Sequence, residues 1–327
     1  MSTILEIGVE RWPIAGTFTI SRGSKTEAAV VICRLVTETA TGRGECVPYA
    51  RYGESIDSVC EQIESIRERL VQGLDRDDLA KLLPAGAARN AVDCALWDLE
   101  AKSARTSVAE LLGLGELRDL TTAVTVSFGD AETMAAATAK FAHRPLIKVK
   151  VGGDDDADRI SAVAAAAPAS RIIIDANEGW NDDNIVANLL ACAKAGVALV
   201  EQPLPAGQDA ILRRIPHPVP ICADESVHAA DDLHQLAGLY DYVNIKLDKT
   251  GGLTEALRMQ QEARRLGFGI MVGCMVGTSL AMAPAMLVAQ DADYVDLDGP
   301  LILKKDREPG LTFSGSLVSP PSPVLWG

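Results

Sequence analysis

The stretch Leu146–Val151 has the sequence LIKVKV and decides how the chain is interpreted. It has the apolar pattern of a β-strand, but two of its residues are lysines that would lie on the same face. In a strand, successive side chains point to opposite sides, so Lys148 and Lys150 share one face and the β-branched residues share the other. Two ammonium groups about 6.5 Å apart repel by roughly 2 to 3 kcal/mol at an effective dielectric near 20, which lowers a lysine pKa towards that of a general base. The alternative is an edge strand with a solvated lysine face.

Similar apolar runs recur along the rest of the chain, each followed by a segment long enough for a helix. From Lys148 the spacings to the ionisable ends of the next runs are 27, 26, 23 and 22 residues. A repeat of strand plus helix in this range is typical of the βα unit, and eight such strands predict a parallel α/β barrel. The expected strands are residues 123–126, 146–151, 171–175, 198–201, 220–224, 242–246, 268–272 and 294–298.

The first third of the chain differs from this repeat and predicts an α+β domain. Residues 28–36 and 45–47 have strand patterns on either side of a glycine-containing turn, and residues 54–70 and 85–104 have helical apolar spacing. We therefore expect three parts, with boundaries at Gly113–Gly115 and near residue 305. The parts are an α+β capping domain (residues 1–115), the barrel (116–305) and a C-terminal segment that returns to the capping domain (306–327).

A polar segment within the capping domain, residues 15–25, contains both glycines and cations. Its composition predicts a mobile loop in which Arg22 and Lys25 could bind an anion. The alternative is a plain hairpin loop whose charges are solvated.

Composition limits the possible partners of the protein. The net charge of −14 argues against nucleic acid and anionic membranes, both of which need clustered Lys and Arg. The first residues, MSTILEIGVERW, lack a basic-then-apolar pattern, and no run of 18 apolar residues occurs, so neither a signal peptide nor a membrane span is expected. Seven cysteines without a C-x-x-C pair suit a reducing compartment, which predicts a cytoplasmic protein.

Most of the expected barrel strands end in an ionisable residue, and in a parallel barrel these ends meet at one rim. Three successive carboxylates would repel one another there, so we expect a bound ion. Oxygen ligands without His or Cys favour Mg²⁺. A metal flanked by two lysines suits removal of a proton α to a carboxylate and its return on the opposite face. Strand-end caps or salt bridges could explain one or two of these positions, which are Lys150, Asp175, Glu201, Asp224, Lys246 and Asp298.

The motifs at these strand ends resemble the enolase superfamily, muconate-lactonizing subgroup, over nearly the whole chain. They are KVK (148–150), DAN (175–177), EQP (201–203), ADES (223–226) and NIKLDKTGG (244–252). The resemblance implies a (β/α)7β modified TIM barrel with one Mg²⁺ per subunit. The implied metal ligands are Asp175, Glu201 and Asp224, and the implied acid/base pair is Lys150 and Lys246. Lys148 is implied to tune its neighbour and to contact the substrate carboxylate.

Other positions resemble the substrate-binding residues of dipeptide epimerases within this subgroup. Asp296 and Asp298 form a D-x-D that is similar to the one that holds the α-ammonium of the dipeptide. Arg22 lies in a stretch that resembles the loop of L-Ala-D/L-Glu epimerases whose arginine meets the glutamate side chain. Three more positions match the substrate surroundings in that family, namely Thr125, Cys274 and Met275. The D-x-D could alternatively be a pair of strand-end carboxylates or a second metal site.

The resemblance therefore implies an isomerase that inverts the glutamate α-carbon of L-Ala-D/L-Glu dipeptides during the recycling of peptidoglycan peptides. The expected partner is a small dipeptide, and a homo-oligomer is possible. Three alternatives remain: another dipeptide specificity, an N-acyl amino acid racemase or o-succinylbenzoate synthase of the same subgroup, and a barrel that binds without catalysing. Loss of dipeptide binding on Asp296→Ala would separate the dipeptide enzymes from the N-acyl and succinylbenzoate enzymes.

Overall fold

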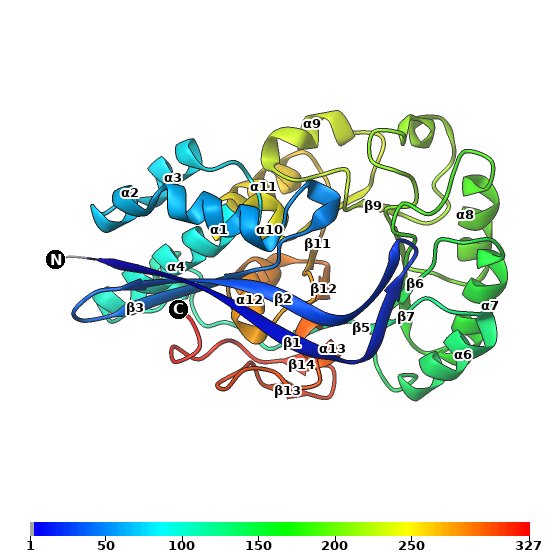
Figure 1. Cartoon of the computed structure of the whole chain (residues 1–327). Helices are drawn as coiled ribbons and strands as arrows, with labels where there is room; N and C mark the ends of the chain where they lie inside the picture. The colour runs from blue at the N-terminus through cyan, green and yellow to red at the C-terminus, as the bar shows by residue number, and fades with distance from the viewer. Residues whose placement is uncertain (1–2) are drawn as a thin grey trace.

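The chain folds around an eight-stranded parallel sheet that curls into a barrel (Figure 1). A computed structural model describes residues 3–327. The strands follow one another around the sheet in chain order, and the Ala123 amide donates to the Val295 carbonyl at 2.8 Å, which joins the two ends. The predicted parallel barrel is confirmed. Its strands are β5 (Val124–Val126), β6 (Leu146–Lys150), β7 (Arg171–Asp175), β8 (Leu199–Glu201), β9 (Ile221–Ala223), β10 (Tyr242–Ile245), β11 (Gly269–Gly273) and β12 (Tyr294–Asp296).

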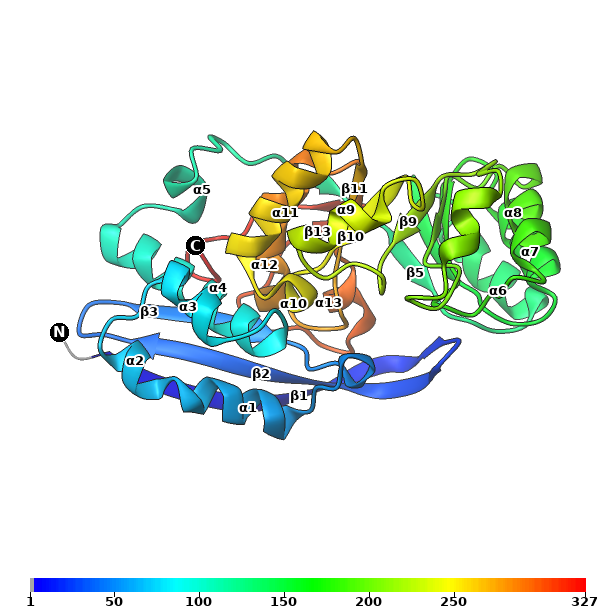
Figure 2. The ribbon, with the colours of Figure 1, turned by 90° about the horizontal axis from the view of Figure 1, so that it is seen from above.

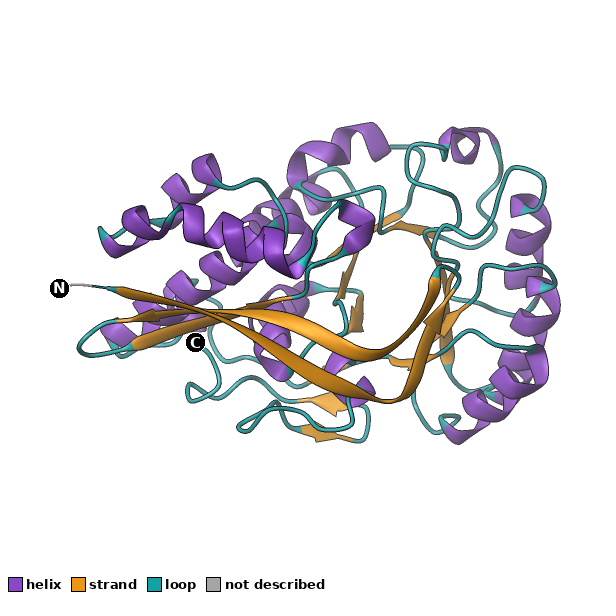
Figure 3. Ribbon diagram, viewed as in Figure 1, coloured by secondary structure: helices purple, strands orange, loops and turns teal. Residues whose placement is uncertain are grey.

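Helices cover the outside of this sheet unevenly (Figure 3). Full helices follow β5, β6, β7, β10 and β11, whereas only short elements follow β8, β9 and β12. Every strand is thus followed by a segment of the expected length, but after β8, β9 and β12 this segment does not form a full helix. The covering elements are α6 (Ala131–Lys140), α7 (Asp156–Ala166), α8 (Ile185–Lys194), η2 (Ala210–Arg214), η3 (Ala230–Asp232), α9 (Leu233–Leu236), α10 (Leu247–Thr250), α11 (Leu253–Arg265), α12 (Ser279–Val288), η4 (Ala289–Asp291) and α13 (Gly299–Ile302).

The N-terminal part is a three-stranded antiparallel sheet with helices packed on it (Figure 2). A separate hydrophobic core lies between this sheet and its helices and includes Val31, Leu35, Val59 and Ile63. The predicted helix over 54–70 is interrupted at Ile66, where the backbone leaves the helical conformation. The elements are β1 (Ile4–Ile20), β2 (Gly23–Val36), β3 (Thr41–Cys46), η1 (Ala50–Tyr52), α1 (Ile56–Ser65), α2 (Arg67–Val71), α3 (Arg76–Leu82), α4 (Ala87–Ala104) and α5 (Val108–Leu111).

The segment 15–25 is not a loop, which corrects the sequence-based prediction of its structure. It forms the end of a long β1–β2 hairpin in which Phe18 pairs with Lys25 and only Ser21 and Arg22 form the turn. The register shifts between Pro13 and Phe18, so the ribbon is irregular there. The polar, glycine-containing composition favours a loop. The segment is a strand instead because pairing with the partner strand decides its structure, and local composition does not show that pairing. In Figure 1 the hairpin extends from the capping sheet to the barrel strands.

The glycine-containing turn expected between residues 36 and 45 is shorter than predicted, because both of its glycines, Gly42 and Gly44, belong to strand β3. Thr37 and Ala40 close the turn with a 2.9 Å backbone hydrogen bond, and β3 begins at Thr41. A Cβ on Gly42 would lie 2.1 Å from the Ala95 carbonyl oxygen of α4. Glycine is therefore needed at this position because it lets the strand pack closely against the helix, and not because it forms a turn.

The last residues of the chain lie against the capping domain. A small sheet joins β13 (Phe313–Ser314) and β14 (Leu317–Val318) to β4 (Leu120–Thr121). Beyond it, the Trp326 indole donates to the Cys94 carbonyl at 3.0 Å, and the Gly327 amide donates to Asp98 at 2.7 Å. Both partners belong to α4. None of the helices within residues 3–327 combines the length and apolarity that crossing a membrane would need.

Candidate active site

The two lysines of β6 point into the barrel and are buried. Lys148 is 1% exposed and Lys150 is 7% exposed, whereas Ile147 and Val149 face the surrounding helices. Strand β6 pairs with β5 on one side and β7 on the other. It is therefore an interior strand, and the alternative of a solvated lysine face on an edge strand is wrong.

Lys148 contacts carboxylates from three different strands. Its Nζ lies 2.7 Å from Glu201, 2.8 Å from Asp296 and 3.1 Å from Asp175. Burial lowers the pKa of this lysine, but the three carboxylates outweigh burial and hold the pKa well above its usual range. Lys148 therefore does not have the lowered pKa that repulsion between two neighbouring lysines would give it, because sequence spacing alone does not count the carboxylates from other strands.

Lys150 and Lys246 lie at separate places around the barrel. Three strands, β7, β8 and β9, stand between β6, which carries Lys150, and β10, which ends just before Lys246. Each lysine is bound by a single aspartate side chain, with Lys150 Nζ 2.5 Å from Asp175 and Lys246 Nζ 2.6 Å from Asp224. Two amines held on different sides of the barrel mouth are the arrangement that two-sided proton transfer requires.

Three acidic side chains end the adjacent strands β7, β8 and β9 as predicted from the sequence. In the strand register Asp175 pairs with Glu201, and Asp224 directly follows β9. Their side chains are turned towards the lysines, and within residues 3–327 no group of three or more His, Cys, Asp or Glu side chains is arranged so that it could hold a metal ion. The set is nevertheless entirely oxygen donors, and at most 1% of any of the three residues is exposed, which suits a hard cation such as Mg²⁺.

The buried carboxylate of Glu201 is incompletely hydrogen-bonded, which favours binding of a further cation. Its Oε1 accepts from Asn244 Nδ2 at 2.8 Å, but its Oε2 is buried and lacks a hydrogen bond of good geometry, although Lys148 Nζ lies 2.7 Å away. Burial, together with the charge of Asp175, raises the pKa of Glu201 to about 7. A buried carboxylate oxygen without a hydrogen-bond partner is uncommon in folded proteins and points to a ligand.

Asp224 is held by two lysines, one of which the sequence-based reasoning missed. Lys249 Nζ contacts Asp224 Oδ1 at 2.6 Å and also donates to the Asp224 and Asn244 carbonyls. Burial raises the pKa of Asp224, but Lys246 and Lys249 outweigh burial and hold it well below its usual range. The signal was present, because a lysine three residues after Lys246 in a short helix lies near the same strand end.

The D-x-D pair at the end of β12 also lies at the mouth of the barrel. Asp296 Oδ2 contacts Lys148, while its Oδ1 is buried without a partner. Asp298 accepts a 2.7 Å hydrogen bond from the Thr125 amide. Burial, with the charge of Asp296 adding to it, raises the pKa of Asp298 to about 7. A bound cation would relieve the repulsion between these two buried carboxylates.

The segment after β11 lies beside this aspartate pair. Met275 is buried and Cys274 is partly exposed. A Cβ on Gly299, the residue after Asp298, would lie 3.1 Å from the Met275 carbonyl oxygen. The structure thus brings Cys274, Met275 and the D-x-D together.

Arg22, at the tip of the capping hairpin, is bound to the barrel by several groups. It donates to Glu225 at 2.6 Å, to the Asn177 carbonyl at 2.6 Å and to Glu178 at 3.0 Å. Arg51 also binds Glu178. Sequence reasoning identified Arg22 but not its carboxylate partners. Glu225 follows the predicted metal ligand Asp224 by one residue, and Glu178 follows Asp175 by three.

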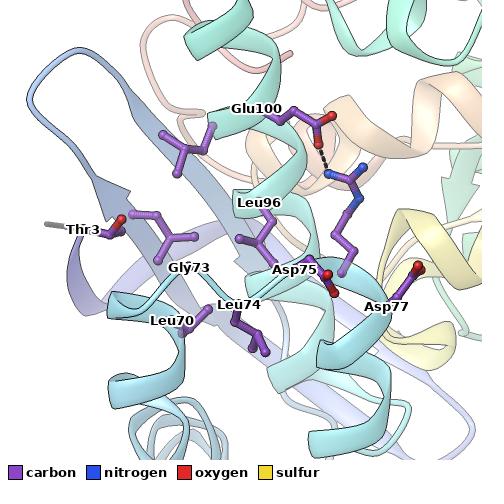
Figure 4. A pocket seen from close by; sticks show the side chains of 11 residues that line it. Thr3, Leu70, Gly73, Leu74, Asp75, Asp77, Leu96 and Glu100 are labelled. Atoms are coloured by element: carbon purple, nitrogen blue, oxygen red, sulfur yellow. Dashed lines mark hydrogen bonds and ion pairs between the residues drawn. The ribbon is translucent and has the colours of Figure 1, made fainter. Parts of the chain in front are cut away.

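A separate hollow of about 370 Å³ lies in the capping domain (Figure 4). Leu70, Leu74 and Leu96 line it, and the ion pair between Arg76 and Glu100 borders it. None of the lysines or carboxylates described above lines this hollow. The lysine–carboxylate cluster at the mouth of the barrel is therefore the candidate active site.

Known proteins resemble the chain over nearly its whole length. The L-Ala-D/L-Glu epimerase of Escherichia coli (strain K12) is 48% identical over 307 residues, which cover 93% of this chain and 96% of that protein. The N-acetyl-D-glutamate racemase of a Pseudoalteromonas species is 47% identical over 88% of this chain and 91% of its own. A crystal structure of an enolase family member from Agrobacterium tumefaciens, with homology to dipeptide epimerases and with bound sodium and L-Ala-L-Glu, is 59% identical. Its TM-score is 0.98, and the match covers 99% of this chain and 100% of that one.

Two family models together match most of the sequence. Residues 3–113 match the N-terminal domain of mandelate racemase and muconate lactonizing enzyme, and residues 130–312 match the enolase C-terminal domain-like family. The second match spans the barrel strands that carry Lys148, Lys150 and the three acidic strand ends. These matches, the barrel with its capping sheet and the lysine–carboxylate rim agree, and the chain belongs to the enolase superfamily.

Proposed function

We propose that this protein is an isomerase that inverts the glutamate α-carbon of L-Ala-D/L-Glu dipeptides. The observation that carries the proposal is the buried aspartate pair at the end of β12, in which Asp296 Oδ1 has no partner and Asp298 has a raised pKa. Lys148 neutralises only one of these two charges, so the pair favours a second cation, and the free α-ammonium of a dipeptide supplies one. A relative that is named L-Ala-D/L-Glu epimerase, at 48% identity, supports the same substrate class.

Lys150 and Lys246 would perform the proton transfers. One lysine, as the neutral amine, removes the glutamate α-proton, and the other, as the ammonium, returns a proton to the opposite face of the planar enolate. The contacts to Asp175 and Asp224 fix where the two Nζ atoms stand. Lys148, between three carboxylates, would remain charged and contact the substrate carboxylate.

The carboxylates of Asp175, Glu201 and Asp224 would hold one Mg²⁺. When bound, such an ion supplies positive charge that stabilises the negative charge developing on the substrate carboxylate during deprotonation. The residues fit this role because they offer only oxygen ligands and because one buried oxygen of Glu201, Oε2, has no hydrogen bond of good geometry. Titration of the metal-free protein with Mg²⁺ by calorimetry is expected to give one site per chain, and Glu201→Gln is expected to weaken it.

Arg22 would bind the γ-carboxylate of the glutamate residue. In the structure its guanidinium already binds Glu225 and the Asn177 carbonyl, so it is held at the barrel in the absence of substrate. Substrate binding would thus exchange one carboxylate partner for another. Thr125, Cys274 and Met275 would line the remainder of the cavity, around the alanine end of the dipeptide.

We further place this reaction in the cytoplasm, in the recycling of peptidoglycan peptides. Support comes from the dipeptide named in the relative above and from the seven cysteines, all of which are free thiols in the structure. Free thiols persist in a reducing compartment.

The second candidate function is racemisation of N-acetyl-glutamate, because a relative with that name is 47% identical. An acylated nitrogen carries no positive charge and gives the aspartate pair no cation to bind. Proton NMR in D₂O with Mg²⁺ separates the two, using L-Ala-L-Glu, N-acetyl-L-glutamate and L-Ala-L-Lys as substrates. We expect the glutamate α-proton signal of L-Ala-L-Glu to disappear while L-Ala-D-Glu appears. Turnover of the N-acetyl compound alone would overturn the proposal.

A further inference from the structure

A buried carboxylate of the capping domain, Glu45 in β3, is fully bound by groups from elsewhere in the chain. Its Oε1 accepts from the Thr278 amide at 2.7 Å, and its Oε2 accepts from the Thr278 hydroxyl and from Arg307 Nη2, the latter at 2.8 Å. Glu45 is 1% exposed. Nothing in the proton transfers described above uses this residue, yet a buried charge of this kind is costly unless it is paired.

The partner of Glu45 stands at the start of α12, directly after the segment that lines the candidate site. Thr278 is the N-cap of that helix, and its hydroxyl accepts from the Leu280 amide at 3.2 Å. Residues 274–277 connect β11 to this cap. The position of Thr278 therefore fixes the end of the segment that contains Cys274 and Met275.

The same segment is enclosed on two sides. A Cβ on Gly277 would lie 3.1 Å from Glu45 Oε1 and 3.1 Å from a methyl group of Val47, both in the capping domain. On the barrel side, a Cβ on Gly299 would lie 3.2 Å from the Gly277 nitrogen. Because Gly299 directly follows Asp298, the backbone at Gly277 lies close both to Glu45 and to the residue that follows the aspartate pair.

Arg307 completes the arrangement from the C-terminal segment. Its Nε donates to the Thr278 hydroxyl at 2.7 Å, and its Nη2 also binds Glu10 of β1 at 2.8 Å. Its guanidinium lies over the Trp12 ring, 5.4 Å from the centroid. Glu45 is thus held by charge and by three hydrogen bonds, which leaves it little freedom to move.

We propose that Glu45 is a positioning residue for the part of the site that receives the amino-terminal residue of the substrate. Through Thr278, Glu45 sets where the 274–277 segment stands relative to Asp298, so it influences selectivity at the first residue without itself touching the substrate. This inference rests on the proposed dipeptide epimerase function.

The test compares Glu45→Gln with the wild type on L-Ala-L-Glu, Gly-L-Glu and L-Leu-L-Glu. Gln keeps an acceptor for Thr278 but removes the charge that binds Arg307. We expect KM for L-Ala-L-Glu to rise about tenfold while kcat changes less than threefold, and we expect the preference for alanine over glycine and leucine to narrow. Thr278→Val, which removes the hydroxyl but keeps the amide, is expected to change KM in the same direction by a smaller factor.

Asp98→Asn is the matched control, because Asp98 is also a fully buried carboxylate of the capping domain. It accepts from the Arg43 and Gly327 amides at 2.8 and 2.7 Å, away from the 274–277 segment. It should lower Tm without changing the preference at the first residue. If Glu45→Gln does not fold, Thr278→Val decides the question by itself.

Unchanged KM and unchanged selectivity in the Glu45 and Thr278 variants would overturn the inference. An equal change in Asp98→Asn would also overturn it, because general destabilisation would then explain the effect. Failure of the proposed function is distinguishable, since in that case the wild-type protein would not epimerise any of the three dipeptides.

Discussion

The mouth of the barrel and the contact between capping domain and barrel both contain buried charges, but they differ in how completely these charges are bound. At the contact, every oxygen of Glu45 has a hydrogen-bond partner. At the mouth, buried oxygens remain without one. Within residues 3–327, five of the seven buried side-chain polar atoms without a partner are oxygens of residues at this mouth, namely Asn177, Glu201, Glu225, Asn244 and Asp296.

This difference distinguishes charged groups that are paired within the protein and stabilise its fold from charged groups that a ligand would pair. A buried ion pair stabilises little by itself, but removal of one partner is strongly destabilising, so satisfied pairs fix the relative positions of segments. Buried oxygens without a hydrogen-bond partner are expected where a bound ion or substrate supplies that partner. On this basis substitutions at the mouth should change catalysis and binding, whereas substitutions at the contact should change stability and geometry.

The largest effect is expected from removal of one base at the mouth. Lys246→Ala should reduce epimerisation of L-Ala-L-Glu by at least about a thousandfold, because one face of the α-carbon would lose its proton donor or acceptor. Exchange of the α-proton with D₂O from one diastereomer should survive, since Lys150 remains, and NMR measures both. Lys81→Ala, at an exposed lysine of α3, is the control. Full epimerisation by both Lys246→Ala and Lys150→Ala would show that the two-base assignment is wrong.

A smaller effect is expected from Asp296→Asn. Loss of one negative charge should raise KM for L-Ala-L-Glu by about ten- to a hundredfold, since a buried charge pair with the ammonium is worth roughly 1.5 to 3 kcal/mol. N-acetyl-L-glutamate, measured with the same variant, is the internal control. Equal losses for both compounds would instead mean that Asp296 acts through Lys148, which it contacts at 2.8 Å.

A change of about tenfold is expected for Arg22→Met. The ratio of kcat/KM for L-Ala-L-Glu to that for L-Ala-L-Gln should fall by this factor, because an ion pair that remains partly solvated contributes about 1 kcal/mol. The matched control is Arg51→Met, because Arg51 shares the partner Glu178 but does not contact Glu225. A ratio that stays constant in Arg22→Met would remove Arg22 from the recognition of glutamate.

The smallest effect, on stability alone, is expected at the contact between the domains. Burial raises the pKa of Asp248 to about 7, with the charges of Glu54 and Glu45 adding to the shift. Because this carboxyl ionises near pH 4 when unfolded, the native state binds the extra proton between about pH 4 and 7, and stability falls as pH rises through that window.

Asp248→Asn should remove this loss, because an amide oxygen can still accept from the Val47 amide and Asn90. The free energy of unfolding is measured in urea at pH 4.5 and at pH 8 for both proteins. Between these pH values the wild type should lose on the order of 1 to 3 kcal/mol that Asp248→Asn does not lose. Asp182→Asn, at an exposed position, controls for the general change in charge. A pH dependence identical to that of the wild type would contradict the expectation.

Local pattern was sufficient to predict the barrel and the positions at its mouth. Apolar runs such as residues 171–175 have the length of a buried strand, and the residue that ends each run must lie at the rim once the strands are parallel. Pattern was insufficient at the β1–β2 hairpin and at Gly42, where a distant strand or helix decides the conformation.

By itself, then, the sequence determined the succession of strands and the chemical character of the rim, because both follow from run length and side-chain period. Only the tertiary structure decided the partners. Lys148 finds Asp296 across 148 residues, Arg22 finds Glu225 across 203, and Glu45 finds Arg307 across 262. Such pairs depend on how the barrel closes and how the capping domain packs on it. No local pattern carries that information, because the strength of a buried charge contact depends on distance in space rather than on separation along the chain.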